Sequence, residues 1–137
     1  MKVGVTGGCG FIGSHVVDKL KDARVDVRII DSVARPHRDD VECVQVDILD
    51  QHALDLTTRG LDVVYHLAAV ADVNNVVADP AGSVALNILG TTRVLEAARR
   101  NQLRRVVLAS TVWVYGAARE ERVDERSCFD PALTGHV

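Results

Sequence analysis

The sequence predicts a single α/β domain whose parallel sheet is doubly wound. Two observations predict this fold class. Continuous apolar runs, typical of strands buried on both faces, alternate with segments of helical spacing. A turn crowded with glycines joins the first apolar run to the first helical segment, as in the first half of a strand-helix-strand unit. The handedness of such crossovers places helices on both faces of the sheet.

The stretch VGVTGGCGFIGSH, residues 3–15, contains the end of the first strand, the turn and the start of the first helix. We expect the strand over 2–6. The helix is expected over 11–23, because Ile12, Val16 and Leu20 recur at helical spacing. The glycines between them allow sharp backbone turns and the close approach of another group, since glycine has no Cβ.

Four further strands and two further helices are expected downstream. The strands are the apolar runs at 25–31, 41–47, 61–69 and 104–111, which bring the sheet to five strands. A short helix is expected over 51–58 and a long one over 80–100, which has a proline at its start. One face of the long helix carries Val84, Ile88, Thr91, Leu95 and Ala98.

Length and composition limit the class of protein. The chain has 137 residues, of which 47% are hydrophobic, and this suffices for the core of one domain. Its formal net charge of −3 gives no general attraction to nucleic acid, and no apolar run reaches membrane-spanning length. Because no secretory leader precedes the first strand, we expect a cytoplasmic protein.

The cysteines and histidines do not indicate a metal site. Cys9, Cys43 and Cys128 are odd in number and contain no CxxC pair, so we expect reduced thiols. The five histidines show no spacing typical of metal ligands. No bound metal is therefore expected.

The glycine turn, with Gly7, Gly10 and Gly13, favours a phosphate ligand. The first amides of the next helix lack partners within the helix and lie at the positive end of its dipole. Asp31 follows Gly13 by 18 positions, at the end of the second strand. The acid that binds an adenosine ribose usually stands about 20 positions after such a turn. A carboxylate there accepts hydrogen bonds from the ribose hydroxyls and repels a 2′-phosphate, so we expect NAD rather than NADP.

Two alternatives to this interpretation of Asp31 remain open. Arg35 and Arg38 follow it closely, and either guanidinium could contact the 2′-phosphate of NADP. Asp31 could also be a solvated strand end that binds nothing.

Four stretches match the motifs of one family. TGGCGFIG matches a TGGxGFIG turn, VDILD an acid and hydrophobe after the third strand, YHLAAVA an HxAA segment, and STVWVYG an S(S/T)xxVYG segment. On these motifs the chain resembles the extended short-chain dehydrogenase/reductases, specifically the NAD-dependent nucleotide-sugar epimerases and dehydratases. The resemblance runs from residue 1 to about residue 125. It implies a Rossmann-type fold, NAD as cofactor and, in the complete enzyme, a nucleotide-sugar substrate.

The resemblance also implies roles for individual residues in the cofactor site. The backbone amides of Phe11 and Ile12 would bind the pyrophosphate. Asp47 would accept a hydrogen bond from the adenine amino group, and Ile48 would pack beside that ring. Small side chains after the fourth strand would let the dinucleotide lie against the backbone at Leu67, Ala68 and Ala69.

At the nicotinamide end the resemblance implies roles for Asn87, Ser110 and Thr111. Asn87 would brace the nicotinamide side, although helical periodicity alone also allows an exposed polar residue. Thr111 falls at the family's catalytic Ser or Thr, whose hydroxyl hydrogen-bonds the sugar oxygen that loses its proton as hydride leaves the same carbon for NAD. Ser110 is the neighbouring candidate. Both hydroxyls could instead belong to a turn.

The family's catalytic base is a tyrosine in a YxxxK motif, which these 137 residues lack. The tyrosines are Tyr65 and Tyr115, and neither has a lysine four residues on. At the family's approximate spacing the tyrosine would fall near His136. That histidine could act as a base near neutral pH, but it has no lysine partner.

Three hypotheses follow for the function. In the first, the chain is the incomplete NAD-binding domain, residues 1–137, of a nucleotide-sugar epimerase or dehydratase, without turnover of its own. In the second, it is an NAD-binding module with a sensing or scaffolding role. In the third, it belongs to a reductase acting on another carbonyl substrate. Family members commonly dimerise through the helix expected over 80–100 and the YxxxK helix, so we expect weak or altered self-association.

Overall fold

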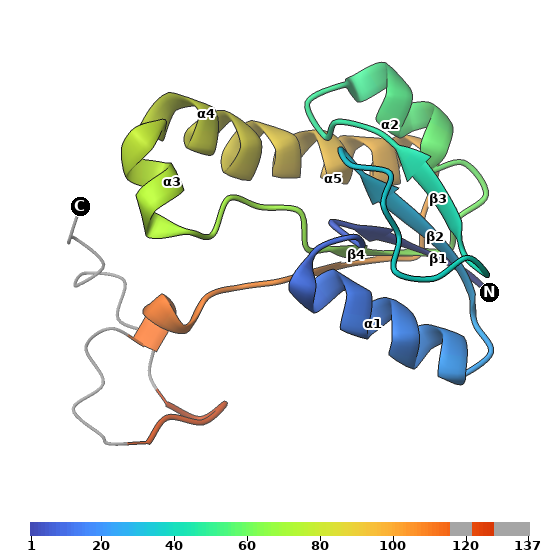
Figure 1. The fold of residues 1–137 in the computed structure, drawn as a ribbon, viewed down its shortest axis with the longest axis horizontal. Helices are drawn as coiled ribbons and strands as arrows, with labels where there is room; N and C mark the ends of the chain where they lie inside the picture. Colours follow the sequence, from blue (N-terminus) through green and yellow to red (C-terminus); the bar gives the residue numbers. More distant parts are fainter. Residues whose placement is uncertain (116–121, 128–137) are drawn as a thin grey trace.

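The computed structural model describes residues 1–115 and 122–127, which contain one five-stranded parallel sheet. The strands are β1 (Lys2–Thr6), β2 (Asp26–Asp31), β3 (Glu42–Gln45), β4 (Val63–His66) and β5 (Arg105–Leu108). Their order across the sheet is β3-β2-β1-β4-β5, and every neighbouring pair is parallel (Figure 1). Winding thus reverses at β1, which confirms the doubly wound, Rossmann-type sheet.

Helices cover both faces of this sheet (Figure 1). Helix α1 (Phe11–Asp22) lies on one face, while α2 (Gln51–Thr57) and α5 (Thr91–Arg100) lie on the other. Successive residues of β2 point to opposite faces. Ile29 packs with Val17 of α1, whereas Ile30 belongs to the cluster that contains Leu54 and Val94 of the opposite layer.

Strands β3, β4 and β5 end earlier than the sequence predicts. Residues 46–47, 67–69 and 109–111 were included in the expected strands but lie outside the sheet. The register explains this difference, because Thr6 pairs with both Ile30 and His66, and His66 pairs with Leu108. Once β1 turns away at Gly7, no central strand remains to pair with the residues beyond that level. Apolar residues past the strand ends therefore line a surface instead of extending the sheet.

The long helix expected over 80–100 is one continuous helical path of three parts. It runs through α4 (Pro80–Val84), a π-helical segment η1 (Ala85–Gly90) and α5. The π-helical segment was not predicted, because i, i+3 and i, i+4 periodicity does not distinguish it from an α-helix. A further short helix, α3 (Val73–Ala78), was also not predicted. It has six residues, too few for the spacing of Val73, Val76 and Val77 to indicate a helix, and none of its residues is buried.

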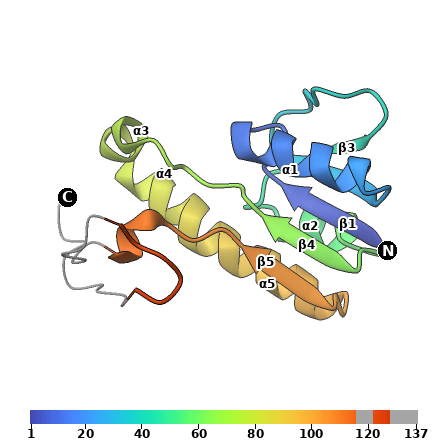
Figure 2. The ribbon, with the colours of Figure 1, turned by 90° about the horizontal axis from the view of Figure 1, so that it is seen from below.

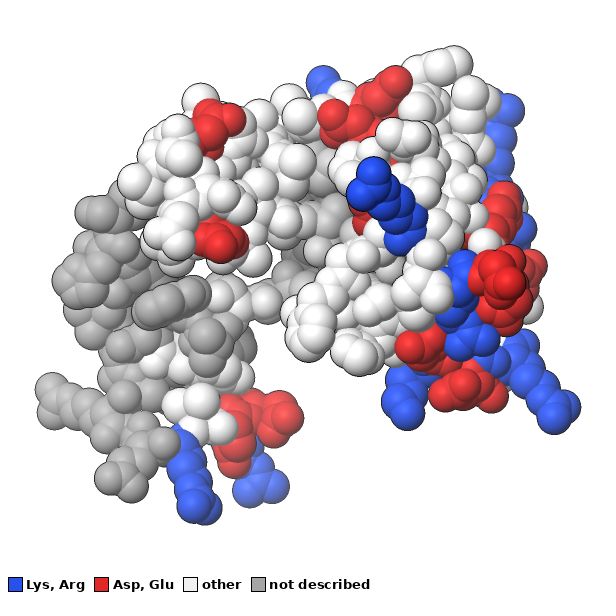
Figure 3. Space-filling model, in the orientation of Figure 1, with Lys and Arg blue, Asp and Glu red and all other residues white. Residues whose placement is uncertain are grey.

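An apolar row on this path is open to solvent. The side chains of Val84, Ile88 and Leu95 are 56%, 64% and 46% exposed, whereas Ala98 of the same row is 5% exposed. Charged side chains on the face seen in Figure 3 gather near the N-terminus and the end of α1, and the surface over α3 and α4 is mostly uncharged. Among the described residues, no helix combines the length and the apolar composition needed to cross a membrane.

One part of the sheet has a helix on a single face only. Seen from below, β4 and β5 lie beside α1 with no described helix in front of them (Figure 2). Val107 of β5 pairs with Tyr65 of β4, which packs with the layer under α1, so these two side chains share that face. An apolar hollow of about 460 Å³ lies between α1 and β4, where Ile12, Val16 and Tyr65 contribute to its wall.

Candidate functional site

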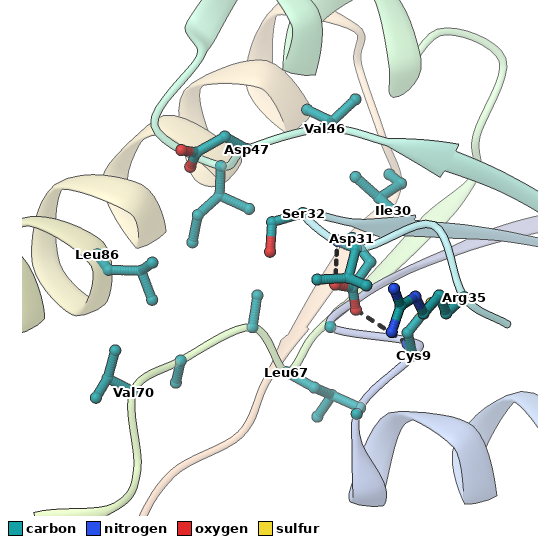
Figure 4. A pocket seen from close by; sticks show the side chains of 16 residues that line it. Cys9, Ile30, Asp31, Ser32, Arg35, Val46, Asp47, Leu67, Val70 and Leu86 are labelled. Atoms are coloured by element: carbon teal, nitrogen blue, oxygen red, sulfur yellow. Dashed lines mark hydrogen bonds between the residues drawn. The ribbon is translucent and has the colours of Figure 1, made fainter. Parts of the chain in front are cut away.

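A pocket of about 520 Å³ opens at the carboxyl edge of the strands. Its walls come from the turn after β1, the ends and following loops of β2 and β3, the segment after β4, and η1 (Figure 4). In an open α/β sheet this edge, where the winding reverses, is the usual place for a ligand. Of the residues expected to hold a cofactor, the pocket brings together Gly7, Gly10, Asp31, Asp47, Ile48, Leu67, Ala68 and Ala69.

The glycine turn is shaped by two close backbone approaches. Gly7 has φ +70°, and a Cβ on it would lie 2.8 Å from the backbone nitrogen of Ala68. A Cβ on Gly13 would lie 2.0 Å from the carbonyl oxygen of Gly7. Gly13 therefore sets the packing of α1 against the turn and does not line the pocket. Gly10 is open on the pocket side, because a Cβ on it would meet only the carbonyl oxygen of Gly7, at 3.2 Å.

The first turn of α1 has no side-chain acceptor for its amides. Its N-cap residue, Gly10, makes no side-chain hydrogen bond. Phe11 and Ile12 follow, with side chains 83% and 64% exposed. Neither residue lines the pocket, so the contact of their backbone N–H groups with a pyrophosphate, which the family resemblance implies, stays a prediction.

Asp31 is held at the end of β2 by two backbone amides. The N–H of Cys9 donates to its Oδ2 at 3.0 Å, and the N–H of Val33 donates to its Oδ1 at 3.0 Å (Figure 4). The carboxylate therefore links the glycine turn to the loop after β2 and lines the pocket between them. Each carboxylate oxygen can accept a second hydrogen bond, and this leaves capacity for ligand hydroxyls.

The end of β3 contributes an acid and a buried hydrophobe. Asp47 is exposed, and its Oδ1 accepts a hydrogen bond from the N–H of Leu49 at 2.8 Å. Ile48 is 4% exposed and packs against Gly90, where a Cβ would lie 2.5 Å from Ile48 Cδ1. Asp47 is thus on the pocket wall, and Ile48 anchors that wall to the helical path behind it.

A buried hydrogen-bond chain fixes the segment after β4. The Thr91 hydroxyl donates its only proton to the carbonyl of Asn87 at 2.6 Å. His66 Nε2, 2.9 Å from that oxygen, is then the donor to it, and Nδ1 accepts from the Thr6 hydroxyl at 2.7 Å. Burial lowers the pKa of His66, which is 3% exposed, so the neutral imidazole is favoured. His66 is thus a buried, hydrogen-bonded residue at the end of β4.

The Thr6 oxygen extends this chain to the pocket wall. It accepts hydrogen bonds from the N–H groups of Leu67 and Ala68 at 3.2 Å and 3.3 Å. Asn87 completes the support further along, because its amide bonds both the N–H and the carbonyl of Val70, at 2.8 Å and 2.9 Å. Asn87 is half-buried, so the alternative of an exposed helix residue is wrong, while its contact with a nicotinamide stays a prediction.

Ser110 and Thr111 lie beyond β5 and are not on the wall of this pocket. Both are exposed, and the carbonyl of Thr111 accepts from the N–H of Val114 as a 3₁₀ turn begins. Their expected place at the end of a fifth strand is corrected, since β5 stops at Leu108. His136 and Cys128 lie outside the described residues.

Sequence reasoning missed part of the pocket wall. The additional lining side chains include Ser32, Val33, Val46, Val70 and Leu86. Arg35, named from the sequence as a possible contact to the 2′-phosphate of NADP, also lines the pocket, whereas Arg38 does not. Most of the additional residues directly flank residues that had been identified, so proximity in the sequence was the available signal. Leu86, which comes from η1, likewise precedes Asn87 in the sequence. Within the part of the chain that the structure describes, no group of three or more His, Cys, Asp or Glu side chains could hold a metal ion.

Comparison with known proteins gives consistent matches over nearly the whole chain. A family model described as the NAD dependent epimerase/dehydratase family matches residues 3–133. The UDP-glucose 4-epimerase of Halalkalibacterium halodurans is 34% identical over 97% of this chain and 40% of its own length. The dTDP-glucose 4,6-dehydratase of Mycolicibacterium smegmatis is 33% identical over 96% of this chain and 44% of its own length.

A solved structure gives the same picture. The UDP-glucose 4-epimerase of Thermus thermophilus, in complex with NAD, has a TM-score of 0.84 and 35% identity, covering 96% of this chain and 45% of that one. The chain therefore spans less than half the length of these relatives.

Proposed function

The chain belongs to the NAD-dependent epimerase/dehydratase family, and we propose that it is the NAD-binding part of a nucleotide-sugar epimerase or dehydratase. The observation that carries this proposal is the position of Asp31, which lines the same pocket as the glycine turn and is bonded to it through the N–H of Cys9. A pyrophosphate site and a ribose acceptor are thereby adjacent, as a dinucleotide requires.

The pocket residues fit NAD in three respects. Gly7 and Gly10 leave the pocket wall at the turn free of side chains, which would obstruct a pyrophosphate. Asp31 has capacity for the ribose hydroxyls, and Asp47 stands on the wall where the adenine amino group would lie. Apolar side chains from β2, from the segments after β3 and β4, and from η1 line the rest of the wall. When bound, NAD supplies the hydride acceptor for oxidation of a sugar carbon.

We infer that Thr111, with Ser110 beside it, orients the sugar hydroxyl in the complete enzyme. A threonine hydroxyl is too weak a base to take the proton alone, and the family's YxxxK motif is absent from these 137 residues. We propose that a segment outside this sequence carries the tyrosine and the lysine. The face of β4 and β5 without a described helix (Figure 2) supports the proposal of a further covering element.

Calorimetric titration of the chain with NAD and NADP tests the cofactor proposal. We expect tighter binding of NAD, and we expect Asp31→Ala to lose about tenfold or more in NAD affinity together with the preference over NADP. The selectivity ratio is the deciding quantity, because Asp31 also holds the glycine turn and its removal weakens any ligand of that turn. Asp39→Ala removes an exposed acid away from the pocket wall and should preserve both affinity and selectivity. Equal selectivity in wild type and Asp31→Ala would contradict the role of this carboxylate.

Incubation with NAD and a panel of sugar nucleotides tests the proposal that the chain has no turnover of its own. We expect no change in NADH absorbance and no chromatographic product. Turnover that survives His136→Ala would contradict the missing-base argument. If the parent reading frame continues into YxxxK, the enzyme is supported over a scaffolding module, and assays of that full-length protein with small carbonyl substrates separate a reductase from an epimerase or dehydratase.

We further propose that the apolar row of Val84, Ile88 and Leu95 is half of a dimer interface in the complete protein. All three side chains are between 46% and 64% exposed, and contiguous exposed apolar surface is typical of interaction sites. Sedimentation of the 137-residue chain should show weak self-association that Ile88→Asp reduces. Leu56→Asp, a change of similar chemistry on α2, should not reduce it. A tight dimer unaffected by Ile88→Asp would contradict this proposal.

A further inference from the structure

Two cysteines from distant parts of the chain meet beside the pocket. Cys9 belongs to the glycine turn, and Cys43 lies on β3, opposite Ile29 of β2. Their Sγ atoms are 3.9 Å apart, and both side chains are half-buried in the apolar layer under α1. No motif in the sequence pairs them, because 34 positions separate them.

The structure assigns this pair as a reversible disulfide switch: we propose that a small-molecule disulfide oxidises Cys9 and Cys43 to an intramolecular disulfide, and that this weakens binding of NAD. The disulfide itself follows from the geometry of the pair, whereas its effect on NAD rests on the proposed function. A bonded pair requires an S–S separation of about 2.0 Å, so the sulfurs must approach by roughly half their present distance.

The surroundings of the two thiols assign their order of reaction. Cys9 lines the pocket, where a solvent-borne reagent can reach it. Burial raises the pKa of Cys43 to about 11, which disfavours its thiolate and makes it the second thiol to react. Strand β3 is at the edge of the sheet and pairs only with β2, so it can follow Cys43 toward Cys9 more easily than a central strand could.

The exchange proceeds in two balanced steps. Cys9 loses its proton to solvent, and the thiolate attacks one sulfur of the small disulfide, forming a mixed disulfide and releasing one thiolate. Cys43 then loses its proton and attacks Cys9 Sγ, forming the Cys9–Cys43 bond and releasing the second thiolate. The two released thiolates take up the two protons. The protein pair loses two electrons, which reduce the small disulfide to two thiols.

The link to the cofactor site is the backbone of Cys9. Its N–H donates to Asp31 Oδ2 at 3.0 Å, so a pull on Cys9 toward Cys43 displaces the turn from the carboxylate proposed to bind the ribose. Bound NAD is expected to affect the thiol in turn. A dinucleotide bound on the turn covers Cys9 and holds the turn in place, so NAD protects the thiol from the reagent.

The test uses the chain with Cys128→Ser, which leaves Cys9 and Cys43 as its only thiols. After treatment with oxidised glutathione, thiol titration should fall from two free thiols to none, and mass spectrometry should find the two cysteine peptides joined, without bound glutathione. The further variant Cys43→Ser should instead retain glutathione on Cys9. NAD should slow the first step, and the oxidised protein should bind NAD about tenfold more weakly, with full recovery on reduction.

Several results would overturn the proposal. A stable glutathione adduct on Cys9 with Cys43 intact would refute the disulfide, as would cross-linking only between chains. Equal NAD affinity in the oxidised and reduced forms would refute the switch. A reduced chain that binds no NAD would refute the proposed function and the switch together, while the thiol titration still decides whether the disulfide forms.

Discussion

Replacing His66 with phenylalanine removes two hydrogen bonds from the interior while keeping a ring at that position. The imidazole accepts from the Thr6 hydroxyl at 2.7 Å and donates to Thr91 at 2.9 Å, and the Thr6 side chain is 0% exposed. In His66→Phe the buried Thr6 hydroxyl loses its acceptor, and an unsatisfied buried donor costs about 1–3 kcal/mol. The loss of the His66 hydrogen bond costs less at Thr91, because the Thr91 hydroxyl still donates to the carbonyl of Asn87. We expect the free energy of unfolding to fall by about 2 kcal/mol at neutral pH.

The difference in free energy of unfolding between wild type and His66→Phe should depend on pH, and this dependence is the sharper test. Burial lowers the pKa of folded His66 below 6.5, the ordinary value that the unfolded chain retains. Between the two pKa values the unfolded state binds a proton that the folded state does not, so stability rises with pH. The stability from neutral His66 is complete above about pH 6.5 and is lost as the pH falls through the folded pKa. Since phenylalanine does not titrate, the difference between wild type and His66→Phe shrinks on acidification, by at most about 1.4 kcal/mol per pH unit.

Urea unfolding followed by far-ultraviolet circular dichroism, at several values from about pH 7.5 to about pH 5, measures both quantities. His52→Gln serves as the matched control, because His52 is an exposed histidine on α2 and its replacement should leave the stability nearly unchanged. A His66→Phe protein as stable as wild type would refute the proton assignment in the buried chain. A difference that stays constant across this range would refute the depressed pKa.

Three further predictions follow from the packing and the hydrogen bonds. Gly13→Ala should lower the free energy of unfolding by about 3 kcal/mol or more and abolish NAD binding, because the added Cβ would lie 2.0 Å from a backbone oxygen. In the control Gly60→Ala, the residue has φ +74° and the added Cβ would meet nothing within 4 Å, so urea unfolding should show a loss of only about 1 kcal/mol. Asn101→Ala removes two 2.8 Å hydrogen bonds from the end of α5 to the end of α2 and should lower the free energy of unfolding by about 1–2 kcal/mol. Arg99→Ala breaks only an exposed ion pair and should lower it much less, and equal losses in urea unfolding would contradict this. Asn87→Ala frees the segment after β4 and should weaken NAD binding in calorimetry while leaving the chain folded; unchanged affinity would show that this segment does not contact the cofactor.

The parts of the fold that the sequence predicted are those with a local signal. The alternation of strands and helices, the glycine turn and the extent of β1 follow from neighbouring residues, and they agree with the structure. The sequence predicted that position 13 must lack a Cβ so that another group can approach closely. The structure shows that this group is the backbone carbonyl of Gly7, which packs against Gly13, and not a ligand. The grouping of Asp31 with the turn was predicted from spacing alone, and both line one pocket.

The sequence by itself determined that this chain is a doubly wound α/β domain with a dinucleotide-type turn, because hydrophobic period, glycine placement and the motif order are all properties of consecutive residues. Only the tertiary structure decided where the strands stop, since the end of β1 leaves β4 without a partner beyond His66. It also decided the proton positions in the buried chain from Thr6 to Asn87, and the meeting of Cys9 with Cys43. These features depend on contacts between segments far apart in the chain, and no local pattern of residues encodes such distances.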